Sequence, residues 1–398
     1  LFWFLWGMIL LVAQGVLPLN PDGNPGQTPD QAFNTCISFL VNCNLQHYSG
    51  ETGLTYFTQL FVIMLFQFIT AACGMAALAG VFRAMAAKTT RTIGNFWVYL
   101  VKSTTRILMP LSLLVGILLI LNGTPMTFDG KQTLTTLEGT EQTISQGPTA
   151  AIVPIKQLGT NGGGYFGVNS AHPLENPNAF TNILECWSIL IIPMAMVFAL
   201  GFYLKRRKLA WSIFGVMLFA YVVGIAVSVD QEMGGSKQIA AMEIRQDMGS
   251  MEGKEVRFGI AQSAMFTTTT TSFTTGTVNN MHDTLTPLGG MIPLLHMMLN
   301  VVFGGKGVGL LPGQLFAPDH PVEHHLHPLD GQVWAAVGRV GRWSIGQARQ
   351  HHGFGVGELQ RRFAKVALRG FADAVVPAAT RTSRASSSTA RQATVAQQ

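Results

Sequence analysis

The stretch QLGTNGGGYFGVNSAHPLENP (residues 157–177) places three successive glycines, then an Asn and a His, in a chain that is otherwise strongly apolar. Such a segment could bind phosphate, bend the chain or line an ion path. No Lys-Ser or Lys-Thr pair follows the glycines and no strand precedes them, which argues against a Walker loop and a dinucleotide-binding turn. Glycine adopts dihedral angles that turn successive carbonyls toward one axis, where they can replace the hydration shell of a cation. We interpret the stretch as an ion-selectivity loop, with a packing turn as the alternative.

The composition indicates that most of the chain lies in lipid. Hydrophobic residues make up 48% of the 398 residues and charged residues only 12%, whereas an ordinary soluble domain carries about twice that charge. The formal net charge of +6 belongs almost entirely to the residues after 310, so the main part has no reason to bind nucleic acid. The four cysteines form no CxxC pair, and we expect no metal site.

Long apolar runs predict a polytopic, all-α membrane protein. Four runs reach or exceed the roughly 20 residues that a membrane-spanning helix needs, and they cover residues 56–82, 95–121, 183–204 and 209–229. Residues 1–16 and 291–303 are shorter apolar segments, and the first is interpreted as the remaining part of a longer helix. Lys102 and Arg106 lie within the second run, where they either snorkel to the membrane surface or face the interior.

Basic residues orient these runs. Arg83, Lys88 and Arg91 lie between the first two runs, and four successive cations occupy residues 205–208 between the next two. The positive-inside rule places both connections in the cytoplasm. The long polar segments at residues 18–55, 122–182 and 230–290 then face outside.

Each of the three outside segments carries a similar short signal. All contain the pattern Asn-x-x-His, at Asn44, Asn169 and Asn279. A segment that could form a short helix precedes each signal, at residues 31–40, 149–158 and 257–272. The predicted unit is a span, an outside re-entrant helix, an irregular polar loop and a second span. Irregular backbone at membrane depth is tolerated only where protein or water surrounds it.

Several side chains beside these loops are candidates for a structural role. His172 and His282 could bind a metal, but no cysteine or second histidine lies near either of them in sequence. They are interpreted as hydrogen-bonded loop anchors, together with Asn169 and Asn279. The acidic residues Glu175 and Asp283 either attract cations to the mouth of the site or are ordinary solvated charges.

At these residues the chain resembles the potassium-binding subunit of the bacterial Kdp potassium-transporting P-type ATPases, the KdpA family. The resemblance covers residues 1 to about 310 and is carried by LPLNPDGNPGQTPDQAFNTCISF, LGTNGGGYFGVNSAHPLENP, MEGKEVRFGIA and VNNMHDTLTPLGGMIP. It implies a potassium-channel-like fold of four span–pore-loop–span repeats in the bacterial inner (plasma) membrane. It also implies binding of extracellular K+ and its inward translocation by an ATP-driven importer. ATP would be hydrolysed by a partner, a KdpB-like P-type ATPase catalytic subunit, and KdpC-like and KdpF-like small subunits would complete the complex.

The resemblance also implies the residues of the ion site, while no catalytic site is expected in the chain itself. By position, the filter candidates are Asn42, Cys43 and Asn44 in the first loop, Thr160, Asn161, Gly162 and Gly163 in the second, and Thr274, Thr275 and Gly276 in the third. Val41 and Cys43 stand where the family usually shows threonine. Backbone carbonyls can come from any residue, so these departures leave the assignment in place.

The predicted organisation has three repeats and a tail. The repeats cover residues 1–82, with a truncated first span and a pore loop near 31–50, residues 83–208, with a pore loop near 149–177, and residues 209–310, with a pore loop near 257–290. The segment 311–398 is basic and lacks an apolar run, which indicates a disordered or out-of-frame tail. Alternative functions are a passive or ion-coupled K+ channel or transporter subunit, or a non-functional truncated fragment.

Overall fold

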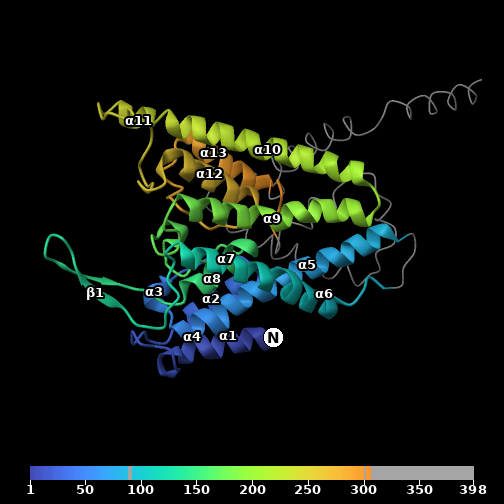
Figure 1. Ribbon diagram of the computed structural model, residues 1–398, viewed down its shortest axis with the longest axis horizontal. Helices are drawn as coiled ribbons and strands as arrows, with labels where there is room; N and C mark the ends of the chain where they lie inside the picture. Colours follow the sequence, from blue (N-terminus) through green and yellow to red (C-terminus); the bar gives the residue numbers. More distant parts are fainter. Residues whose placement is uncertain (88–91, 300–301, 306–398) are drawn as a thin grey trace, which may run out of the picture. The chain divides into compact units, whose positions relative to one another are not determined.

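The computed structural model describes residues 1–87, 92–299 and 302–305 (Figure 1). The described part is mostly helical, and four of its helices are long and apolar enough to cross a membrane: Tyr56–Ala86, Phe96–Leu121, Ala179–Tyr203 and Arg207–Met233. The four long apolar runs of the sequence are confirmed as helices. A helix pairs its own backbone N–H and C=O groups, and this is required in the bilayer core because no water is present there to pair with them.

Two of these long helices contain a wider turn. The first consists of α4 (Tyr56–Thr58), the π-helical turn η2 (Gln59–Met64) and α5 (Leu65–Ala86). The second consists of α6 (Phe96–Ser103), η3 (Thr104–Leu108) and α7 (Met109–Leu121). Pro110 has no N–H to donate to the carbonyl of Arg106, which explains why the regular pattern breaks at η3. Lys102 and Arg106 are exposed on this helix, which favours snorkelling over an interior role.

The other two long helices run side by side in Figure 1. They are α9 (Ala179–Tyr203) and α10 (Arg207–Met233). Asn178 caps the start of α9, because its side chain accepts a hydrogen bond from the backbone N–H of Thr181 at 3.0 Å. A turn of three residues separates the two helices, so they are antiparallel neighbours.

The described residues also form shorter helices. They are α1 (Phe2–Ala13) with η1 (Gln14–Val16), α2 (Pro29–Leu40), α3 (Gly50–Gly53), α8 (Thr149–Leu158), η4 (Asn169–Ala171), α11 (Lys237–Ala240), α12 (Gly259–Ser272) and α13 (Pro287–Leu299). The helices α2, α8 and α12 confirm the three predicted short helices. Each begins within two residues of the predicted start and ends at the predicted residue.

The short helices α2, α8 and α12 have equivalent neighbours. The helix α2 packs against α1 and α5, α8 against α7 and α9, and α12 against α10 and α13. Each therefore lies between the apolar helix that precedes it and the one that follows it. Buried apolar side chains join these groups, for example Leu11, Phe39 and Phe66 around α2, and Val115, Val153 and Leu184 around α8. Between membrane helices such side chains contribute mainly through close van der Waals packing.

The all-α prediction is wrong in one detail. Strands β1 (Gln132–Thr135) and β2 (Glu141–Ile144) form an antiparallel hairpin, in which Gln132 pairs with Ile144. The hairpin extends away from the helices in Figure 1, and nearly all of its strand residues are exposed. The sequence analysis placed this segment in the polar outside region 122–182 without a strand, although its threonines favour strands.

Two predictions lie outside the described residues. They are the tail at residues 311–398 and the orientation signal from Lys88 and Arg91. The repeat boundaries stay predictions.

Candidate ion-binding site

The three short helices α2, α8 and α12 are followed by loops with the same backbone pattern. In each loop two residues have positive φ, between 48° and 96°, and the residue between them does not. These pairs are Asn42 and Asn44 in the first loop (residues 42–44), Thr160 and Gly162 in the second loop (residues 160–163), and Thr274 and Gly276 in the third loop (residues 274–276). Alternation in the sign of φ rotates successive peptide planes, so that neighbouring carbonyls can face one side.

The chain leaves each short helix through equivalent hydrogen bonds. The N–H of the second loop residue donates to a carbonyl in the last turn of the helix, five residues earlier. The bonds are Cys43 to Ser38 at 3.0 Å, Asn161 to Lys156 at 2.9 Å and Thr275 to Thr270 at 2.9 Å. A hydrogen bond between residues five apart that encloses a residue in the left-handed conformation is the Schellman motif, which commonly ends a helix.

Threonine at the left-handed position is unusual. Thr160 and Thr274 are β-branched, with φ of 48° and 51°, and a β-branched residue rarely adopts such angles. The left-handed conformation costs a non-glycine residue about 1–2 kcal/mol. Strain of this kind persists where the surrounding structure holds it, and it clusters at functional sites.

Hydrogen bonds join the first and second loops. The side-chain amide of Asn42 donates to the carbonyl of Thr160 at 3.4 Å, and that of Asn44 donates to Oδ1 of Asn161 at 3.5 Å. Thr70 of α5 donates to Oδ1 of Asn42 at 2.8 Å. The two loops therefore share one buried polar region, although 118 residues separate Asn42 from Thr160 in sequence.

The second and third loops approach each other through a glycine. A Cβ atom on Gly162 would lie only 2.0 Å from the backbone oxygen of Thr275. The φ of Gly162 is 96°, so both its conformation and this contact require glycine. In the glycine-rich stretch 157–177, Gly162 therefore lies where the second and third loops meet.

The three loops differ in burial. Thr160 and Asn161 are almost completely buried, whereas Cys43 of the first loop and Gly276 of the third are exposed. The second loop contacts both of the others and lies between them. Near it, Oδ1 of Asn44 and Oε1 of Gln67 are buried without a hydrogen-bond partner among the described residues. Such oxygen atoms suit a cation or a water molecule.

Polar residues of α5 hold the loops, and the sequence analysis missed them. Gln67 donates to the carbonyl of Gly163 at 2.7 Å, and Thr70 contacts Asn42 as described above. Both are buried in an apolar helix. The available signal was their position, because a polar side chain inside a membrane-spanning run needs a partner in the protein.

A buried charged network supports the second loop from behind. The ammonium group of Lys156 pairs with Glu175 and donates to Ser170 Oγ at 2.8 Å. Ser170 donates to Glu185 of α9 at 2.5 Å, and Gln157 donates to the same carboxylate at 2.5 Å. All of these side chains are inaccessible to solvent. The network connects the last turn of α8 to the chain that follows the glycines.

This network corrects the prediction for Glu175. Glu175 neither lies at a mouth nor is solvated, because it is fully buried and paired with Lys156. It also accepts a hydrogen bond from the N–H of Phe166 at 2.7 Å. Asp283, in contrast, is exposed.

The four predicted anchors behave differently. His172 stacks on the ring of Phe166 with centroids 3.6 Å apart, and its Nδ1 accepts a hydrogen bond from the N–H of Leu174 at 3.1 Å. Asn169 donates to Gln46 at 3.4 Å, and Asn279 donates to Asn182 at 3.0 Å.

His282 does not fit the prediction of a hydrogen-bonded anchor. Its Nε2 is buried without a partner among the described residues. Burial lowers the pKa of both His172 and His282 from the ordinary value, so each favours the neutral form.

The fold and the loops together define a helical membrane protein with a buried polar site where three irregular segments meet. The family model of the potassium-transporting ATPase A subunit, KdpA, matches residues 1–317, and the chain belongs to this family. The match ends within the region that is not described.

Curated relatives carry the same description. A protein of Phocaeicola vulgatus, named as the potassium-transporting ATPase potassium-binding subunit, is 72% identical over 309 residues, which cover 78% of this chain and 54% of the relative. Relatives of the same name from Flavobacterium psychrophilum and Delftia acidovorans are 55% identical over 314 residues and 47% identical over 313 residues. These alignments cover 79% and 77% of this chain, respectively, and 55% of each relative. The chain spans about half the length of the curated relatives it matches.

Proposed function

We propose that this chain binds extracellular K+ and passes it inward as the channel-like subunit of an ATP-driven potassium importer. Membership of the family and the name shared by the relatives support this function. The observation that carries the proposal is the repeated backbone of the three loops, each with two positive φ values after a short helix. Carbonyl oxygens presented in this way can replace the water around K+.

The proposed filter consists of the residues with alternating φ and their neighbours. They are Asn42, Cys43 and Asn44, Thr160, Asn161, Gly162 and Gly163, and Thr274, Thr275 and Gly276. The second loop is enclosed by the other two, whereas Cys43 of the first loop and Gly276 of the third are exposed. This difference fits an arrangement in which a further loop lies between the third loop and the first. A fourth pore loop of this kind is expected from the family resemblance.

Energy for inward transport comes from a partner in this proposal. The partner is a KdpB-like P-type ATPase catalytic subunit, with KdpC-like and KdpF-like subunits in the same complex. The location is the bacterial inner membrane, where the chain crosses several times. The connections around Arg83 and residues 205–208 then face the cytoplasm.

Transport into vesicles tests this proposal against its alternatives. Uptake of K+ is measured with the chain alone and with the co-expressed ATPase subunits. The proposal predicts ATP-dependent uptake with the partners present. Uptake by the chain alone without ATP would favour a passive channel, and no uptake in either case would favour a non-functional fragment.

A variant in the second loop tests the filter. Gly162→Asp introduces a side chain where Cβ alone meets the Thr275 carbonyl, and we expect the complex to lose K+ affinity. Gly139→Asp is the matched control, because Gly139 has φ of 83° but nothing within 4 Å of its Cβ position. Unchanged K+ affinity in an active Gly162→Asp complex would show that the second loop is not part of the filter.

A further inference from the structure

The turn between α9 and α10 concentrates positive charge at one end of two membrane-length helices. Residues 205–208 are Lys205, Arg206, Arg207 and Lys208, and all four are exposed. The sequence contains no Asp or Glu between Glu185 and Asp230. None of the four cations forms an ion pair with a residue that the structure describes. We call residues 205–208 the basic turn.

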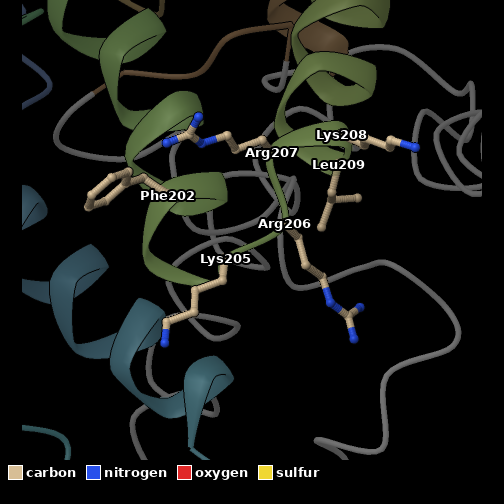
Figure 2. Close-up of a pocket in the computed structure, with 6 residues that line it drawn as sticks. All are labelled: Phe202, Lys205, Arg206, Arg207, Lys208 and Leu209. Carbon is tan, nitrogen blue, oxygen red and sulfur yellow. The ribbon is translucent and has the colours of Figure 1, made fainter.

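The basic turn surrounds a depression of about 760 Å³, shown in Figure 2. Its lining consists of the four cations together with Phe202 and Leu209. A second depression, of about 200 Å³, is lined by Phe198, Phe202, Arg207, Ala210 and Trp211. The two adjoin, because Phe202 and Arg207 line both. One is therefore cationic and the other mainly aromatic.

The side chains are arranged so that charge and apolar surface meet. In Figure 2, Arg207 extends from the start of α10 toward the helix that carries Phe202, whereas Lys208 points to the opposite side. Phe202 is 73% exposed and Trp211 is 63% exposed. The ring of Phe198 lies 5.0 Å from that of Trp211 in an edge-to-face arrangement. Exposed aromatic rings beside cations are typical of the region where a membrane meets water.

We propose that the basic turn binds the phosphate headgroup of an anionic phospholipid, and that one acyl chain of the lipid lies along Phe198, Phe202 and Trp211. Four cations without an ion-pair partner in the described part of the chain attract a phosphate, and basic pockets between membrane helices are suited to anionic headgroups. The aromatic depression favours a lipid over a free anion, because a free phosphate has no apolar part to place there. It also favours a lipid over an acidic protein surface, because the aromatic depression is lined by residues of α9 and α10, which are long and apolar enough to cross a membrane. This inference does not depend on the K+ site.

Native mass spectrometry of the full chain in detergent tests the proposal, with phosphatidylglycerol and phosphatidylcholine as matched anionic and zwitterionic probes. The wild-type chain binds phosphatidylglycerol more tightly. Each cation near an anionic lipid changes the affinity about fivefold at low salt. The variant K205Q/R207Q therefore loses about 25-fold in phosphatidylglycerol affinity, and its preference over phosphatidylcholine shrinks by the same factor.

Two further variants separate headgroup binding from general effects. R245Q removes an exposed cation from the segment between α11 and α12, outside both depressions, and leaves the lipid preference unchanged. W211S removes part of the aromatic lining and weakens the binding of both lipids. Unfolding temperatures of all variants stay close to that of the wild type, because the replaced side chains are exposed.

Three results would overturn the proposal. The first is equal binding of the two lipids by the wild type, which is also the result expected if the basic turn serves a protein contact. The second is a loss in R245Q as large as that in K205Q/R207Q. The third is full displacement of phosphatidylglycerol by inorganic phosphate at equal concentration, which would assign the turn to a free anion.

Discussion

Replacement of Lys156 by Met should destabilise the chain more than a surface substitution does. Lys156 lies in the last turn of α8, and its ammonium group pairs with Glu175 and donates to Ser170. Ser170 in turn donates to Glu185, and both acidic residues are inaccessible to solvent. Methionine fills a similar volume but supplies no charge. The K156M variant therefore leaves buried carboxylates without their cation.

The magnitude follows from the cost of an uncompensated buried charge. Breaking a buried ion pair by removal of one partner costs about 3–5 kcal/mol. The free energy of unfolding, measured by titration of mixed detergent micelles with SDS, should fall by that amount in K156M. The double variant K156M/E175Q removes one charge of each sign, and it should lose less than about 2 kcal/mol because the replaced pair is nearly neutral in its effect.

An exposed lysine provides the control. Lys102→Met alters a cation on an exposed helix face and should change the free energy of unfolding by no more than about 0.5 kcal/mol. A loss below about 1 kcal/mol in K156M, or an equal loss in K156M and K156M/E175Q, would refute the reasoning, because the network would then not depend on its charge balance.

Two other predictions concern residues that lie against Tyr165 and Phe166, just after the second loop. Burial lowers the pKa of His172 below the ordinary 6.5, so its contribution to stability is fully present above pH 6.5 and decreases as the pH falls toward the folded-state pKa. The unfolding temperature of His172→Gln should therefore depend less on pH below 6.5, and an unchanged slope would contradict this origin. Gly50→Ala places a Cβ 2.0 Å from the carbonyl oxygen of Tyr165 and should lower the free energy of unfolding by about 1–3 kcal/mol. Gly215→Ala, in α10 with nothing within 4 Å, should be neutral or stabilising; equal losses in these two variants would show that the contact at Gly50 is unimportant.

The apolar helices could be predicted from sequence because their signal is local. A run such as residues 56–82 contains no charge, and only a helix satisfies its own backbone in lipid. The structure extends this helix to Ala86. The hairpin at Gln132–Thr135 and Glu141–Ile144 was missed, because four-residue strands in a polar segment give a weak pattern.

The candidate site was predictable only in part. The glycines and the repeated Asn-x-x-His pattern locate the second loop, and the structure places Gly162 against Thr275. The partners of the loops could not be predicted, because they come from residues far away in sequence. Gln67 and Gly163, for example, are 96 residues apart. Lys156 and Glu185 each interrupt an apolar segment, and this isolation of a charge was the one local sign of a buried network.

The central claim is that the three loops form a site for K+, and direct ion binding by the purified chain tests it most closely. Calorimetric titration with K+ and Na+ should show K+-selective binding by the wild type and by Gly139→Ala. Gly162→Ala, whose Cβ would meet the Thr275 carbonyl, should bind K+ at least about tenfold more weakly. Equal K+ affinity in Gly162→Ala and the wild type would contradict the account.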